Sequence, residues 1–182
     1  MTPARSITNL LANHAAAVSE FVARAAAVPA SQWDVARGDG KWSPAQETKH
    51  LALGYEAFVR DLRGGTRLRL KGRWWQRQLW RWRALPRIFA TDRLPTGVRA
   101  PREVRPSERP GDQSTLLAEL HAQVSEFEAA IVNAEETEPR RRVTHPYFSV
   151  LSLRELVKLC TVHARHHMAF LPVLQPFVAE NR

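Results

Sequence analysis

The sequence predicts an all-α protein built as a four-helix bundle, and three observations lead to that fold class. Apolar residues recur every three or four positions in four long segments, which is the period of an amphipathic helix. Two of these segments begin with a capping box, one at Ser43 and one at Ser152. The two-residue alternation of a half-buried strand occurs at most in residues 67–71, which are short and highly charged.

The first two helices have clear start and stop signals. Helical spacing over residues 3–28 predicts the first helix, with Thr2 suited to its cap and Pro3 to its first turn. The second helix begins after the capping box at Ser43 and ends near Gly64-Gly65.

The third and fourth helices follow a long connection. The third is predicted from Asp112 to about Glu136 and has acidic outer positions. The fourth begins after Ser152 and carries an apolar stripe as far as Leu174, although Pro172 should kink or shorten its end by removing a backbone donor. In a bundle of this kind, facing side chains of different helices build the site.

Length and composition predict one cytoplasmic domain spanning residues 1–182. The chain is 44% hydrophobic, which is enough for one full core. A lone cysteine, Cys160, excludes an intrachain disulfide or a zinc site built from several cysteines, and it fits a reducing compartment. No uninterrupted apolar run approaches the roughly 18 residues of a membrane span. A soluble protein is therefore expected.

The net charge of +9 arises in one part of the chain. Residues 60–109 carry 14 Arg and one Lys against four acidic residues, whereas the remainder carries 12 basic and 14 acidic ones. An anionic partner should therefore be sought there. Residues 66–111 are predicted to be an irregular or short-helical insertion, which ends in a proline-containing strap over residues 92–111.

Tryptophans interleave with arginines in residues 67–83, and this pattern supports three hypotheses. The segment could bind an anionic lipid surface or single-stranded nucleic acid. The tryptophans could instead cover the mouth of the bundle, while the arginine heads face water and bond to acidic helix faces. We prefer this second hypothesis, because a connection between helices must bury its own aromatics. The arginines could also flank a pocket and attract a carboxylate-bearing thiol or substrate.

Two histidines of the fourth helix form half of a candidate metal site. His163 and His167 lie about 40° apart on a helical wheel, near the middle of the apolar stripe. Buried imidazoles one turn apart would compete for protons, or repel if both were charged, whereas shared coordination of a cation satisfies both. The spacing alone is weak evidence, because such pairs are also common in packing and on surfaces.

His50 completes a candidate metal site of His50, His163 and His167. It lies two turns into the second helix and is followed one turn later by Gly54. Helical side chains lean toward the N-terminus, so glycine at position 54 leaves space over His50, at a cost of about 1 kcal/mol of helix propensity. The alternative explanation of Gly54 is close packing between helices.

Other polar residues near these histidines are weaker candidates. Glu47, one turn before His50, is a candidate partner of a metal ligand or a catalytic proton acceptor, although glutamate is also ordinary in a first helical turn. His14 is more readily a satisfied core histidine than a fourth ligand, and Cys160 a small buried hydrophobe. His166 is assigned to the edge of the stripe, His121 to the flank of a helix, and His145 to a loop.

Three short segments carry a resemblance to a known family: Lys41-Trp42-Ser43-Pro44 running into His50-Leu51-Ala52, the loop His145-Pro146-Tyr147-Phe148, and His163-Ala164-Arg165-His166-His167. On these segments the chain resembles the DinB/YfiT-like superfamily of bacterial metalloenzymes. The likeness covers most of residues 1–178. The motifs are short, but their order and spacing together are specific.

The resemblance implies an up-down-down-up bundle whose first histidine is His50 and whose paired histidines are His163 and His167. Members with assigned activities look like thiol-dependent S-transferases or isomerases that use a bacterial low-molecular-weight thiol, or like metal-dependent hydrolases. Homodimers are common among them, so a homodimer is expected. The resemblance does not explain residues 67–83.

Together with the three histidines, the resemblance implies a metal-dependent enzyme, of the thiol-dependent S-transferase or hydrolase type, that acts on a small electrophilic molecule. Three neutral imidazoles leave a divalent ion its full charge and open positions, where a water or thiol loses its proton near neutral pH. Zinc is the first choice, and nickel or iron also accept nitrogen ligands. The competing hypotheses are a non-catalytic bundle and a binder of membrane surfaces or nucleic acid through residues 67–83, whose binding would weaken steeply with salt.

Overall fold

The computed structural model describes residues 6–172, and most of these are helical. The elements follow one another as α1 (Ile7–Ala26), α2 (Ala30–Trp33), α3 (Pro44–Leu62), α4 (Trp74–Thr91), the 3₁₀ turn η1 (Arg102–Val104), α5 (Gln113–Thr137), β1 (Arg142–His145), β2 (Ser149–Ser152) and α6 (Leu153–Met168). The predicted cap residues Thr2 and Pro3, and the stripe residue Leu174, lie outside the described residues.

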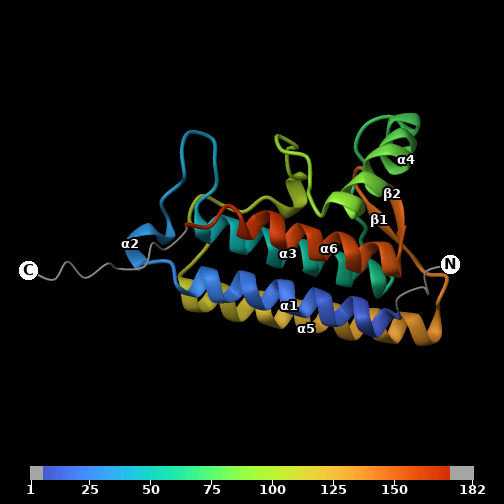
Figure 1. Ribbon diagram of the computed structural model, residues 1–182, viewed down its shortest axis with the longest axis horizontal. Coiled ribbons are helices and arrows are strands. Elements are labelled where there is room, and N and C mark those ends of the chain that lie inside the picture. The colour runs from blue at the N-terminus through green and yellow to red at the C-terminus, as the bar shows by residue number, and fades with distance from the viewer. Residues whose placement is uncertain (1–5, 173–182) are drawn as a thin grey trace, which may run out of the picture.

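Four long helices form the predicted up-down-down-up bundle (Figure 1). Helices α1 and α5 make one layer, and α3 and α6 make the other. Helix α3 packs along α5, and α1 packs along α6, with the partners of each pair running in the same direction. The core between the layers is closed by large, fully buried side chains that include Phe21, Leu51, Leu120, Phe127, Ile131 and Leu156.

Local signals in the sequence set where these helices begin. Both predicted capping boxes form: the Ser43 hydroxyl accepts from the backbone of Gln46, and the Ser152 hydroxyl from that of Glu155. The carboxylate of Asp112 caps α5 in the same way. These caps fix the starts of α3, α5 and α6, and with them the heights of the side chains that face one another across the bundle.

The expectation of a bundle without strands was incomplete. Strands β1 and β2 pair antiparallel as a small hairpin, with Arg142 opposite Ser152 and His145 opposite Ser149. Residues 67–71, which were the candidate strand, are not in regular structure. Strands of four residues are too short to show a period in the sequence. The hairpin leads directly into α6 and places its turn, residues 146–148, beside the bundle.

The insertion at 66–111, predicted to be irregular or short-helical, contains a long helix of 18 residues, α4, which stands out from the bundle (Figure 1). Its inner side is held by buried Leu85 and Ile88, and by Arg81, which binds the carboxylate of Glu155. The proline-containing strap that follows has only the short turn η1 as regular structure. Among the described helices, none combines the length and the apolarity needed to cross a membrane.

Candidate metal centre

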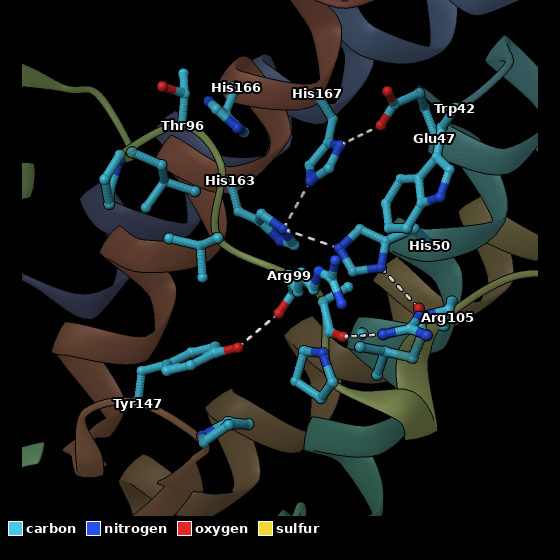
Figure 2. A pocket seen from close by; sticks show the side chains of 18 of the residues that line it. Trp42, Glu47, His50, Thr96, Arg99, Arg105, Tyr147, His163, His166 and His167 are labelled. Carbon is cyan, nitrogen blue, oxygen red and sulfur yellow. Dashed lines mark hydrogen bonds and ion pairs between the residues drawn. The ribbon is translucent and has the colours of Figure 1, made fainter. Parts of the chain in front are cut away.

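The three predicted histidines meet between α3 and α6 (Figure 2). The Nε2 atom of His163 lies 3.2 Å from Nε2 of His50 and 2.9 Å from Nε2 of His167. One ring nitrogen of each residue lies within 4.8 Å of the other two. The side chain of His50 and those of His163 and His167, which lie more than a hundred residues later in the sequence, therefore point at one common position.

Hydrogen bonds on the far side of two rings set the direction of their lone pairs. Nδ1 of His50 lies 2.7 Å from the carbonyl oxygen of Val104, and Nδ1 of His167 lies 2.5 Å from Oε2 of Glu47. A carbonyl and a carboxylate oxygen accept, so the ring proton of each imidazole is on Nδ1. The lone pairs on both Nε2 atoms consequently face His163.

The charge state of the three rings favours a bound cation. Burial lowers the pKa of His50, His163 and His167 below the ordinary value of 6.5, and their mutual repulsion lowers those of His163 and His167 further. Neutral imidazoles are the form that ligates metals. A proton on Nε2 of His163 can be donated to Nε2 of His50 or to Nε2 of His167, but not to both. Hydrogen bonding alone therefore leaves at least one pair of nitrogen lone pairs facing each other.

The spacing of the donor atoms also suits a metal. Tetrahedral coordination with nitrogen ligands at about 2.0–2.1 Å separates those ligands by about 3.3 Å. The separations of 3.2 and 2.9 Å at His163 are close to that value, and the third pair of donor atoms, those of His50 and His167, lies within 4.8 Å. The residues present therefore fit one divalent ion, and the geometry does not distinguish zinc from nickel or iron.

Glu47 is a buried carboxylate with both oxygens engaged. Its Oε2 accepts from His167, and its Oε1 accepts from the Arg37 guanidinium at 3.0 Å. Burial raises the pKa of Glu47, while the hydrogen bond and the charge of Arg37 lower it. The sequence-based suggestion that Glu47 contacts a ligand histidine agrees with this geometry, whereas a free proton acceptor would need an unengaged oxygen.

Two residues beside the histidines were missed as parts of the site. The Trp42 ring lies 4.8 Å from that of His50 and packs nearly parallel to that of His167 at 6.2 Å. Trp42 could have been suspected from its place just before the capping box of α3. Arg37 lies in an irregular loop, and no local pattern distinguishes it from other surface arginines.

The histidines form part of the wall of a pocket of about 650 Å³. Its other walls come from the strap between residues 94 and 105, the hairpin turn and Gly54 of α3. A Cβ atom built on Gly54 would meet no heavy atom within 4 Å. The space over His50 is therefore open, as predicted, and close helix packing does not explain this glycine.

Comparisons with known proteins agree with this architecture. A sequence profile of the DinB superfamily matches residues 14–171. The chain belongs to the DinB superfamily. Its structure is similar to that of YfiT from Bacillus subtilis, described as a probable metal-dependent hydrolase with an unusual four-helix bundle topology, with 17% identity, a TM-score of 0.57, and coverage of 94% of this chain and 89% of the other. At this identity the likeness shows the fold. A search of curated proteins found no match.

In this DinB-superfamily bundle, His14 is a core residue. It is fully buried, with Nδ1 at 2.8 Å from Glu128 and Nε2 at 2.8 Å from the hydroxyl of Tyr55. Both ring nitrogens are therefore satisfied by protein atoms, as in the preferred interpretation of the sequence. His121 is exposed on α5 and takes no part in the site.

Three other residues border the pocket outside the three-histidine cluster. Nδ1 of His145 accepts from the backbone amides of Tyr147 and Phe148, both at 3.3 Å, and burial lowers the pKa of His145 to about 3. His145 thus anchors the hairpin turn. Cys160 is buried, and burial raises the pKa of its thiol. His166, which was expected at the edge of the stripe and facing an interface or solvent, lines the pocket and packs edge-on against Phe170.

The preferred hypothesis for the tryptophans of residues 67–83 is wrong for three of the four. Trp74, Trp75 and Trp82 are 69%, 48% and 78% exposed, so they do not cover the bundle. From this segment only Leu68 and Trp80 line the pocket in the described chain. The basic side chains of the pocket wall come instead from the loop before α3 and from the strap: Arg37, Lys41, Arg99 and Arg105.

Proposed function

We propose that this protein is a metal-dependent enzyme that acts on a small electrophilic molecule, as a thiol-dependent S-transferase or as a hydrolase. The observation that carries the proposal is the convergence of Nε2 of His50, His163 and His167 at the wall of a 650 Å³ pocket. A divalent ion at this point, with zinc as the first choice, would supply Lewis acidity and lower the pKa of a water or thiol beside it.

The chain's own residues hold this arrangement in place. Val104 and Glu47 fix the tautomers of His50 and His167, so that two lone pairs are aimed before any ion arrives. Arg37 holds the other oxygen of Glu47 at 3.0 Å, and its hydrogen bond and charge oppose the rise that burial gives the carboxylate pKa. Trp42 covers one side of two rings with apolar surface and limits the access of water there.

The pocket favours a substrate that carries an anionic group. A volume of about 650 Å³ is within the usual range for small-molecule sites. Among the described lining residues Glu47 is the acidic one, and its charge is met by Arg37. Arg105 of the strap donates to a backbone carbonyl, that of Ala100, at 3.2 Å, and Figure 2 shows Arg99 and Arg105 beside the histidines. Guanidinium groups placed in this way suit a carboxylate or phosphate.

A nucleophilic thiol, if one is used, would be supplied from solution. The chain has one cysteine, Cys160, and burial raises its pKa, so its thiol stays protonated near neutral pH. A low-molecular-weight thiol would need room for itself and for the electrophile, and the pocket has that room. Dependence of turnover on added thiol separates the transferase from the hydrolase.

The test is elemental analysis of natively purified protein, followed by a screen of small electrophiles with and without added thiol. We expect about one divalent ion per chain, its loss in His163→Ala, and its retention in His121→Ala, which removes an exposed histidine of α5. Turnover should be abolished by a chelator and restored by zinc. Full metal content in His163→Ala would refute the ligand assignment, and bound metal without any turnover would favour a non-catalytic bundle.

A further inference from the structure

The outer face of α4 is an exposed apolar stripe. Trp75, Leu79 and Trp82 are 48%, 46% and 78% exposed, and Pro86 is exposed as well. Their spacing of four, three and four residues places them on one side of the helix, within about 60° of one another. We name these four residues the α4 stripe. A group of exposed tryptophans is unusual on a protein surface, because each ring leaves a large apolar area in contact with water.

The stripe is held outward by contacts on another side of the same helix. Leu85 and Ile88 are buried against the bundle, at 3% exposure each. Arg81 donates to both carboxylate oxygens of Glu155, at 2.9 and 3.1 Å, and to the carbonyl of Val150. These contacts fix the rotation of α4, so the stripe cannot turn inward without breaking them.

Positive charge lies along one side of the stripe. Between residues 62 and 91 the sequence contains eight Arg and one Lys and no acidic residue. Arg83 and Arg87 lie beside the stripe on the helical wheel and are exposed, and no ion pair links either of them to an acidic residue among the described residues. A surface that combines exposed tryptophans with unpaired arginines is suited to the interface of a lipid bilayer, where anionic headgroups lie above apolar acyl chains.

Charge and shape favour lipid over the other occupants. A second copy of α4 would bring arginines against arginines, which opposes symmetric pairing of this face. Single-stranded nucleic acid is bound by stacking in a groove that follows its backbone, whereas α4 stands out from the bundle and its stripe includes aliphatic Leu79 and Pro86 (Figure 1). Indole rings and guanidinium groups along one helix match the interface of an anionic bilayer.

We propose that α4 is an interfacial helix that docks the protein onto an anionic lipid surface through the α4 stripe, with Arg83 and Arg87 facing the lipid headgroups. This docking is independent of the metal centre, because none of these residues lies in the wall of the pocket. Trp80 does line the pocket, so the docked helix would hold one side of the pocket close to the membrane surface.

The test is co-sedimentation of the full chain with vesicles of phosphatidylcholine, with and without phosphatidylglycerol. We expect binding to the anionic vesicles at low salt, little binding to the neutral ones, and weakening by salt. Trp75→Ser with Trp82→Ser, or Arg83→Glu with Arg87→Glu, should each lower the partition coefficient by about tenfold or more. Val132→Ala, which trims an exposed apolar side chain of α5, is the matched control and should bind like the wild type.

Circular dichroism and metal content confirm that each variant remains folded. Equal binding of the wild type and both double variants, or no binding of the wild type to anionic vesicles, would overturn the proposal. So would a dimer in size-exclusion chromatography that dissociates in Trp75→Ser with Trp82→Ser, because the stripe would then be a contact between copies. Tighter binding to an oligothymidylate than to the vesicles, lost in the same variant, would assign the stripe to nucleic acid instead.

Discussion

Nδ1 of His167 lies 2.5 Å from Oε2 of Glu47, and 120 positions of sequence separate the two residues. Both side chains are buried, and the second oxygen of Glu47 is held by Arg37. A carboxylate behind a ligand histidine fixes the ring and raises its basicity. The proposed metal centre therefore depends on a buried charge that does not itself point at the metal position.

Replacing Glu47 should weaken metal binding without removing any ligand. Glu47→Ala is expected to lower zinc affinity by about 10–100-fold, and Glu47→Gln by less, because the amide oxygen can still accept from His167. Competition with a chromophoric chelator measures the dissociation constant. Glu56→Gln is the control, since Glu56 is a half-exposed glutamate of the same helix. Unchanged affinity in Glu47→Ala would show that His167 does not need this partner.

Two substitutions of Gly54 should distinguish the effect of this glycine on helix stability from its effect on the space in the pocket. Gly54→Ala is expected to raise the free energy of unfolding by up to about 1 kcal/mol, because alanine favours the helix and its Cβ meets no neighbour. Gly54→Leu should fill the space over His50, leaving bound metal in place but reducing turnover. Urea unfolding and steady-state kinetics measure the two effects. Destabilisation by alanine would mean that the space is not open.

Acid should destabilise the protein through His145. Burial lowers the pKa of His145 from 6.5 to about 3, so between these values the unfolded chain binds a proton that the folded chain does not. The stability that neutral His145 contributes is complete above about pH 6.5 and falls toward pH 3, by at most about 1.4 kcal/mol per pH unit. Urea unfolding from pH 7 to pH 4.5 should show a shallower pH dependence for His145→Gln. An identical slope in both proteins would contradict the assignment.

His14 should prove structural. His14→Ala leaves Tyr55 and Glu128 without their buried partner, and should lower the free energy of unfolding by about 2 kcal/mol or more. His121→Ala, at an exposed position, should change it by less than about 0.5 kcal/mol. Metal content should be the same in both variants. Loss of metal in a folded His14→Ala protein would make His14 part of the centre.

Much of the bundle could be predicted from local sequence, because caps and helical period are local properties. The capping boxes at Ser43 and Ser152 form as predicted, and the 3.6-residue period placed His50, His163 and His167 on inner faces. Helix α4 was underestimated because its apolar residues lie all around the wheel, one set packed on the bundle and the other exposed. Only tertiary contacts such as those of Leu85 distinguish the two sets.

The surroundings of the histidines were less predictable. His50 is oriented by the backbone carbonyl of Val104, and any residue type carries such a carbonyl. Arg37 reaches Glu47 from an irregular loop whose path depends on the packed bundle. Sequence patterns could therefore indicate the candidate donor residues and the partner Glu47, but not the carbonyl of Val104 or the guanidinium of Arg37.

Crystals of the zinc-loaded protein measured at the zinc absorption edge would test the central claim most directly. We predict one anomalous peak, at about 2.0–2.1 Å from Nε2 of each of His50, His163 and His167, and facing the pocket. A peak bound by other residues, or bound by only one of the three while another ring turns to solvent, would contradict it.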